Sequence, residues 1–161
     1  MKKNVLLIIM VGMLFLTGCN KKTNVDTEGK LLSEEYAEIF KEEIKNDKDI
    51  LDIAKTISKN ENIEFKAEVT ELGKEDYLVG FNNEIKGYKR VVQVAPMVST
   101  IPFVLYIFEV EEAEDFAEKL KNEANPRWNI CTEADEVLVE YDGNYVFMVM
   151  TPSGDNSNNE E

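Results

Sequence analysis

The chain has 161 residues, with 32 acidic and 18 basic side chains and no histidine, which gives a net charge of −14. Acidity of this size repels nucleic acid and anionic lipid headgroups, so we expect no nucleic-acid partner. The lack of histidine excludes Ser-His-Asp and Cys-His catalysis and histidine-ligated zinc, and no glycine-rich phosphate-binding motif is present.

The first residues predict a secretion signal. A basic start is followed by residues 5–16, about a dozen uncharged positions, whereas a membrane-spanning helix needs roughly 20. The sequence Leu16-Thr17-Gly18-Cys19 then resembles the lipobox of bacterial lipoproteins. This resemblance implies cleavage before Cys19 and a diacylglyceryl group, with acyl chains such as palmitate, on its sulfur. Two acyl chains give stable anchoring, so we expect the chain on the extracytoplasmic face of the cell membrane. The alternative is an uncleaved N-terminal anchor with the same orientation.

The predicted mature chain forms one domain. Cleavage would remove the signal peptide 1–18 with Lys2 and Lys3 and no acid, so the net charge would change from −14 to −16. Residues 19–30 are polar and predict a tether, and residues 152–161 have the composition of a disordered acidic tail. The folded domain is therefore expected over residues 31–151.

The pattern after residue 30 predicts two short helices or one bent helix. Ser33 is the expected N-cap of the first helix, followed by Glu34 and Glu35 in the first turn, where the helix dipole favours acid. The apolar positions of this helix recur at helical spacing: Leu32, Tyr36, Ile39, Phe40 and Ile44. Asp49 is the expected cap of the second helix, whose apolar face comprises Ile50, Ile53, Ala54 and Ile57.

Three strands are expected next. Residues 63–70 alternate apolar and polar side chains, which predicts a strand with one solvated face. A connector over residues 73–87, which allows a short helical turn at 76–81, leads to predicted strands at 88–95 and 101–110. The last of these has an unbroken apolar run from Ile101 to Phe108, so both of its faces must be covered. We expect it at the centre of the sheet or against a partner.

A helix and a hairpin complete the predicted domain. Residues 111–124 have acids at the start, later lysines and a following Pro126, all typical of a helix. Residues 136–150 contain two strand-like runs around Asp142-Gly143, a pair suited to a tight turn. This order predicts an α+β fold, with a mainly antiparallel sheet of about five strands packed with two to three helices.

Candidate chemistry is limited to carboxylates and one thiol. With Cys19 lipidated, Cys131 has no partner for an intramolecular disulfide, and we interpret it as a small buried apolar residue rather than a nucleophile. The densest acidic group, residues 109–115, lacks the spacing and turn glycine of a calcium loop. We interpret these acids as a favourable helix start and expect no metal and no cofactor.

Two loops contain the candidate binding residues. Residues 95–102 join the second and third strands, and residues 125–135 join the last helix to the hairpin and contain the chain's only tryptophan. If both loops lie at one end of the sheet, they form a shared patch: Met97, Ser99, Thr100, Arg127, Trp128 and Thr132. Tryptophan and arginine are favoured at interaction hot spots. The alternative is that Trp128 only packs its loop onto the core.

One family resemblance accompanies these motifs. Residues 87–120 and 141–150, together with the lipobox, resemble small lipoproteins of Gram-positive bacteria that contain an uncharacterised α+β domain. The shared features are architectural: a Pro-Met turn between two strands, an acidic helix start and a Gly-Asn hairpin. The resemblance covers about residues 75–151 and implies no catalytic residue.

The sequence therefore favours a membrane-anchored, non-enzymatic module that binds an envelope protein or peptide. One alternative is a cell-envelope hydrolase that uses paired carboxylates or Cys131. Another is an acidic cation-binding or structural envelope protein.

The anchor is testable by one substitution. Because acylation and the following cleavage require the thiol of Cys19, we expect Cys19→Ala to leave an uncleaved precursor without incorporated fatty acid. Metabolic labelling with an alkyne-tagged fatty acid measures this. Cys131→Ala is the matched control and should label normally, whereas labelling of the Cys19→Ala chain would contradict the lipoprotein interpretation.

Overall fold

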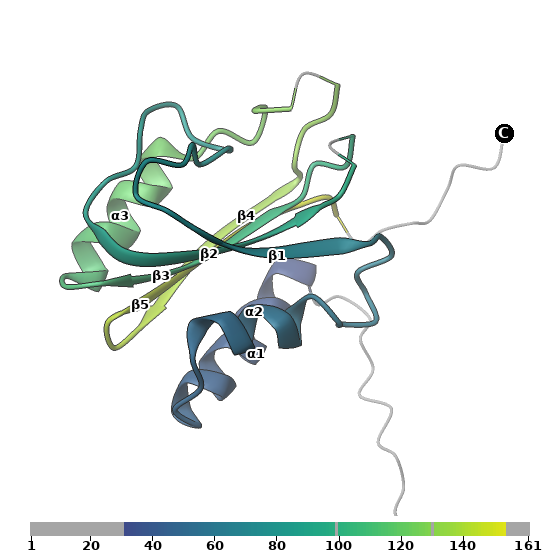
Figure 1. The fold of residues 1–161 in the computed structure, drawn as a ribbon. Helices are drawn as coiled ribbons and strands as arrows, with labels where there is room; N and C mark the ends of the chain where they lie inside the picture. The colour runs from purple at the N-terminus through teal and green to yellow at the C-terminus, as the bar shows by residue number, and fades with distance from the viewer. Residues whose placement is uncertain (1–30, 99, 130, 154–161) are drawn as a thin grey trace, which may run out of the picture.

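The computed structural model describes residues 31–98, 100–129 and 131–153. These residues form an antiparallel five-stranded sheet with helices on both faces, which confirms the predicted α+β class (Figure 1). The helices are α1 (Leu32–Lys45), α2 (Ile50–Ile57) and α3 (Ala113–Glu123). The strands are β1 (Ala67–Leu72), β2 (Tyr88–Pro96), β3 (Val104–Val110), β4 (Glu136–Asp142) and β5 (Tyr145–Thr151), in the spatial order β1-β2-β3-β5-β4. The predicted leader and tether, and the tail from residue 154, lie outside the described residues.

Strand β3 lies at the centre of the sheet, as its apolar run predicts. It pairs with β2 on one side and β5 on the other, both antiparallel. Its alternate side chains belong to two separate cores. Leu105 and Ile107 face α1 and α2, whereas Tyr106 and Phe108 face α3, and all four are fully buried. The whole sheet is therefore a middle layer between two apolar cores.

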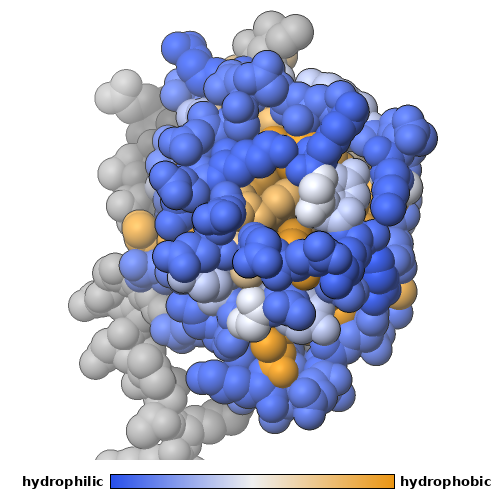
Figure 2. All heavy atoms as spheres, turned by 90° about the vertical axis from the view of Figure 1, so that its left-hand side faces the viewer, coloured by the Kyte–Doolittle hydropathy of each residue, from blue (hydrophilic) through white to orange (hydrophobic). Residues whose placement is uncertain are grey.

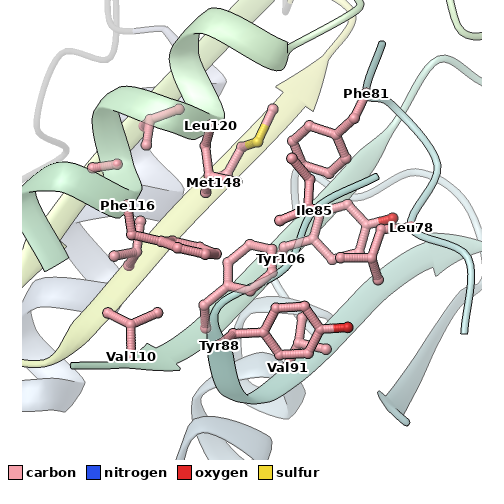
Figure 3. Packing of buried hydrophobic residues seen from close by; sticks show 14 of the residues in the cluster. Leu78, Phe81, Ile85, Tyr88, Val91, Tyr106, Val110, Phe116, Leu120 and Met148 are labelled. Carbon is pink, nitrogen blue, oxygen red and sulfur yellow. The ribbon is translucent and has the colours of Figure 1, made fainter. Parts of the chain in front are cut away.

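The α3-side core combines the helix, the sheet and the connector 73–87. Phe116 of α3 meets Phe108 edge-on, with ring centroids 5.1 Å apart. Figure 3 shows Leu78, Phe81 and Ile85 of the connector pointing into the same cluster as Tyr106 and Met148. The connector forms no helical turn over residues 76–81, so that expectation is wrong. Its apolar residues are instead held in an irregular path against the sheet.

The start of α1 differs from the prediction. The helix begins at Leu32, and Leu31 occupies the N-cap without a side-chain hydrogen bond. Ser33, the predicted cap, is buried, and its backbone N–H donates to Glu136 Oε2 of β4 at 2.9 Å. The carboxylate of Glu136 thus accepts one of the free backbone N–H groups at the start of α1, a role that a capping residue usually has.

Other boundaries also shift from the prediction, among them the start of β3, which begins at Val104 rather than residue 101. Strand β1 begins at Ala67 rather than residue 63, although Ile63 and Phe65 still pack against the core on the side of α1 and α2. In the β4–β5 hairpin the two loop residues are Gly143 and Asn144, one position later than predicted. Gly143 has φ of +57°, a left-handed conformation that glycine adopts without steric cost.

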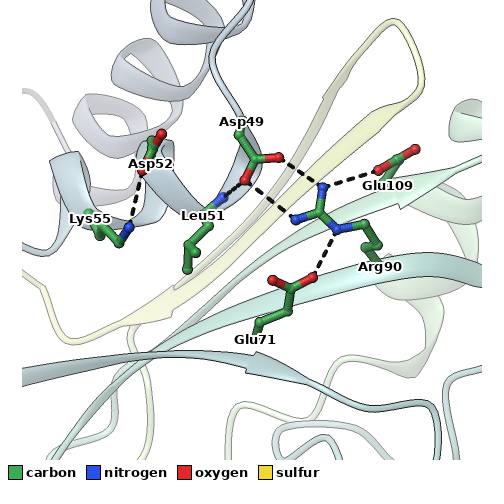
Figure 4. A network of polar contacts seen from close by, with 7 residues as sticks. All are labelled: Asp49, Leu51, Asp52, Lys55, Glu71, Arg90 and Glu109. Carbon is green, nitrogen blue, oxygen red and sulfur yellow. Dashed lines mark hydrogen bonds and ion pairs between the residues drawn. The ribbon is translucent and has the colours of Figure 1, made fainter.

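An ion-pair network on β2 connects α2 to the sheet (Figure 4). Arg90 Nη1 lies 2.8 Å from Asp49 Oδ2, and Arg90 Nε lies 2.8 Å from Glu71 Oε1 of β1. Asp49 is the N-cap of α2, as predicted, and its Oδ1 accepts the backbone N–H of Leu51. These hydrogen bonds, from Arg90 first and Leu51 second, hold the pKa of Asp49 below its usual value.

One face of the molecule is mostly polar. Viewed from the left-hand side of Figure 1, the molecule shows mainly hydrophilic residues with a small apolar area at the centre (Figure 2). This distribution agrees with the net charge of −14.

The Asp49 network predicts a pH-dependent stability difference. Asp49→Asn retains a capping oxygen but removes the charge, and we expect it to lower the free energy of unfolding by less than about 1 kcal/mol at pH 7, because the pair is partly exposed. Asp49→Ala also removes the cap and should cost about 1 kcal/mol more. Urea unfolding curves measure both differences.

The sign of the pH dependence follows from the lowered pKa of Asp49. The folded-state charge stabilises the protein above the pKa of the unfolded carboxyl, about 3.9, and this contribution is lost as the pH falls through the folded pKa. The stabilities of the wild-type chain and of Asp49→Asn should therefore begin to converge as the pH falls below about 4, and their difference should be smallest below the folded pKa of Asp49. A constant difference from pH 7 to pH 2 would contradict the role of the charge.

Candidate functional site

The two loops of the predicted patch lie at the same end of the sheet. One spans residues 97–103 between β2 and β3, and the other spans residues 124–135 between α3 and β4. Thr132 Oγ1 donates a hydrogen bond to the carbonyl oxygen of Thr100 at 3.3 Å, which joins the two loops directly. Within the second loop, the Ala134 N–H donates to the carbonyl oxygen of Pro126 at 3.0 Å.

A cleft of about 400 Å³, here named the Trp128 cleft, opens between these loops. Most of its wall is apolar, and its lining comes from the connector, β2 and both loops: Val79, Ala95, Pro96, Ile101, Phe103, Trp128, Asn129 and Cys131. Trp128 is half-buried, because it also packs against the α3-side core. Trp128 therefore does two things: it packs its loop against the α3-side core, and it lines the Trp128 cleft.

The other described patch residues, Met97, Thr100, Arg127 and Thr132, belong to the two loops but do not line this cleft. Met97 is exposed over 56% of its surface, and Thr100 and Thr132 are exposed beside their shared hydrogen bond. Arg127 is exposed and forms an ion pair with Glu133, with Nε and Oε2 3.2 Å apart. Ser99 lies outside the described residues.

Cys131 is exposed, so the interpretation as a buried apolar residue is wrong. Its backbone N–H donates to Asn129 Oδ1 at 3.2 Å, and the loop is thus closed by a local turn rather than by burial of the thiol. Cys131 is instead one of the residues that line the Trp128 cleft.

The buried Tyr106 holds Val79, a residue of the Trp128 cleft wall that the sequence did not predict. The Tyr106 hydroxyl on β3 donates to the carbonyl oxygen of Val79 at 3.1 Å and accepts from Gln93 Nε2 at 2.8 Å. Burial raises the pKa of Tyr106, so the hydroxyl stays protonated and able to donate at neutral pH. Next to Val79, the carbonyl oxygen of Gly80 accepts the Asn125 N–H at 2.9 Å, which ties the connector to the second loop.

A second cleft, here named the Tyr36 cleft, is also lined by residues of the segment 101–103. It has a volume of about 320 Å³ and shares Ile101 and Phe103 with the first. Its remaining lining is more polar and comes from α1, the loop before β1 and the end of β5: Leu32, Tyr36, Asn62, Glu64, Phe65, Thr151, Pro152 and Ser153. Burial, followed by the charges of Glu35 and Glu136, raises the pKa of Tyr36 to about 12.

The acidic group at residues 109–115 is dispersed by the fold. Glu109 lies 3.7 Å from Arg90 and Glu111 lies 3.7 Å from Lys89, while Glu114 and Asp115 occupy the first turn of α3. Over residues 31–98, 100–129 and 131–153, no three acidic or cysteine side chains converge as ligands for a metal ion. No helix in the same ranges has the length and apolar character to cross a membrane.

Comparison of the chain with protein-family models, curated proteins and solved structures finds no match. The resemblance to small Gram-positive lipoproteins therefore stays a prediction, and the case for function depends on the geometry of the two clefts.

Removal of the Tyr106 hydroxyl should lower the stability of the protein and make Trp128 more accessible. Tyr106→Phe leaves the Val79 carbonyl and the Gln93 amide without this partner, and we expect the free energy of unfolding to fall by about 1–3 kcal/mol. Because the cleft wall then loosens, acrylamide quenching of Trp128 fluorescence should increase. The matched control is Tyr141→Phe at an exposed position, which should change stability by less than about 0.5 kcal/mol. Equal behaviour of the two variants would contradict the positioning role of Tyr106.

Proposed function

We propose that this chain is an extracytoplasmic lipoprotein, anchored through lipid on Cys19, that binds a protein or peptide of the cell envelope without catalysis. The Trp128 cleft is its binding surface. The observation that carries this proposal is an open, largely apolar cleft beside a tryptophan, on a sheet whose two faces are covered by helices and the connector.

The dimensions of the Trp128 cleft suit an inserted side chain. Its volume of about 400 Å³ is at the lower end of the range of pockets that bind small molecules. Apolar walls formed by Ile101, Phe103 and Trp128 favour an apolar side chain of the partner. Met97 and Val98 are exposed beside β2 and extend the apolar contact outside the cleft.

The chemistry of the cleft supports binding more than hydrolysis. Its described lining contains no carboxylate, lysine or arginine, so Cys131 has no general base beside it in that wall. Activation of a cysteine requires a base or a cationic environment that lowers the pKa of its thiol. Binding of a partner's apolar side chain requires neither a base nor a cationic environment.

The net charge favours a basic partner. At −16 after the predicted cleavage, the chain attracts cationic surfaces over several ångströms and increases the rate of encounter with them. Short-range contacts in the Trp128 cleft then slow the dissociation of the complex.

The proposal predicts a cross-link from the cleft itself. A thiol-reactive photocrosslinker attached to Cys131 of the full chain, in its own membranes, should form a discrete adduct with a partner on illumination. We expect Trp128→Ala to lower the adduct yield at least about fivefold, which corresponds to the loss of about 1 kcal/mol of binding energy. Trp128→Phe should retain most of the yield.

The control for this experiment is Tyr77→Ala, which removes an aromatic side chain that is 75% exposed in the connector. It should leave the adduct unchanged. If Trp128→Ala folds with an unchanged circular dichroism spectrum and still gives the full adduct, the Trp128 cleft is not the binding surface.

A further inference from the structure

We propose that the free edge of β4 pairs with the same edge of a second copy of this chain, so that two five-stranded sheets join into one continuous antiparallel sheet. The pairing is centred on Val139, where a two-fold axis passes between the two copies. This inference goes beyond the proposed function, because no described residue that lines the Trp128 cleft belongs to β4.

The position of β4 at the end of the sheet carries the first step. In the order β1-β2-β3-β5-β4, it pairs with β5 alone among the described strands. Asp142 and Tyr145 close a two-residue loop, and such a pair exchanges its backbone hydrogen bonds. Bonded and non-bonded positions alternate, so Val137, Val139 and Tyr141 direct their N–H and C=O groups away from β5. Among the described residues, no hydrogen bond from another element reaches these groups.

The side chains at these three positions carry the second step. They share one face of the sheet, because alternate residues of a strand do so. Val139 is buried in the α3-side core, whereas Val137 and Tyr141 are 42% and 44% exposed. These are two of the six large apolar side chains that are exposed among the described residues. A second β4 strand beside the first covers both of them.

Strand β4 is complementary to itself in one antiparallel register. With Val139 opposite Val139 of the second copy, Val137 lies opposite Tyr141 in both halves of the interface. Such a pair of a β-branched and an aromatic side chain is favourable across two strands. The residues whose backbone groups point outward also lie opposite one another, so each outward N–H meets a C=O of the second copy.

The acidic side chains of β4 leave little free charge along this edge. Glu140 forms an ion pair with Lys41 of α1, with Oε2 and Nζ 3.2 Å apart. Glu136 accepts the Ser33 N–H at the start of α1, where the helix dipole is positive. Asp142 lies opposite Glu136 of the second copy only at the two ends of the interface.

The other edge of the sheet has a different character. Strand β1 exposes the carboxylates of Glu68 and Glu71, and none of the exposed large apolar side chains among the described residues lies on it. Charged side chains commonly protect an edge strand from pairing. The self-association surface is therefore assigned to β4.

A disulfide test measures the register directly. Chains with Val137→Cys and chains with Tyr141→Cys, both also with Cys131→Ala, are co-expressed with different tags and oxidised in their own membranes. We expect a disulfide between the two kinds of chain, because positions 137 and 141 face each other across the axis. Each variant expressed alone should give at least about tenfold less product, since two copies of the same position lie about 14 Å apart.

Sedimentation equilibrium of the full chain in zwitterionic micelles measures the strength of the dimer. Val137→Glu should weaken it at least about tenfold, because a carboxylate is then buried against Tyr141 of the second copy. Val137→Pro should also weaken it, since proline removes an outward N–H and leaves the ladder with β5 intact. Tyr77→Glu is the matched control: it adds the same charge at a position that is 75% exposed in the connector, and it should leave the dimer unchanged.

The salt dependence gives a further check. Both copies are acidic and the contact is apolar, so added sodium chloride should strengthen the dimer. A chain that remains monomeric at millimolar concentration would overturn the proposal. A dimer that tolerates both folded variants at Val137, as judged by circular dichroism, would place the interface elsewhere and overturn it too. Equal disulfide yields in the mixed and single samples, or a disulfide to a different protein instead, would contradict the pairing of two β4 strands.

Discussion

Burial of β3 on both faces is the constraint on which the rest of this structure depends. Its side chains alternate between two cores, and neither row tolerates water, so each face of the sheet needs a cover. Helices α1 and α2 cover one face, while α3 together with the irregular connector covers the other. With both faces covered, the largely apolar Trp128 cleft lies at the end of the sheet where the chain enters β3.

Polar contacts at that end determine the shape of the opening. The Tyr106 hydroxyl holds the connector at Val79, and the bond between Thr132 and Thr100 holds the two loops together. The segment 101–103 consequently contributes Ile101 and Phe103 to both the Trp128 cleft and the Tyr36 cleft.

Local sequence patterns predicted most of the fold and little of the site. The run from Ile101 to Phe108 predicted a central strand, because eight apolar residues have no solvated face to occupy. The cap at Ser33 was predicted wrongly, since its N–H binds a carboxylate 103 residues away and no local pattern encodes that contact. Trp128 is a candidate from sequence because it is the only tryptophan. The part of the Trp128 cleft wall at Val79 is not, because its position depends on the hydroxyl of Tyr106, 27 residues away. The exposed position of Cys131 follows from a turn made by Asn129, which residue type alone does not determine.

The most direct test of the account is to ask where a small apolar molecule settles on the protein. Methyl-resolved NMR of the chain during titration with isopropanol maps such sites without a known partner. The account predicts saturable shifts at the methyl groups of Val79 and Ile101, with none at Ile107 and Val149 inside the covered core. If the methyl groups of the Trp128 cleft do not shift, or if the shifts are concentrated elsewhere, the Trp128 cleft is not the site that binds apolar molecules.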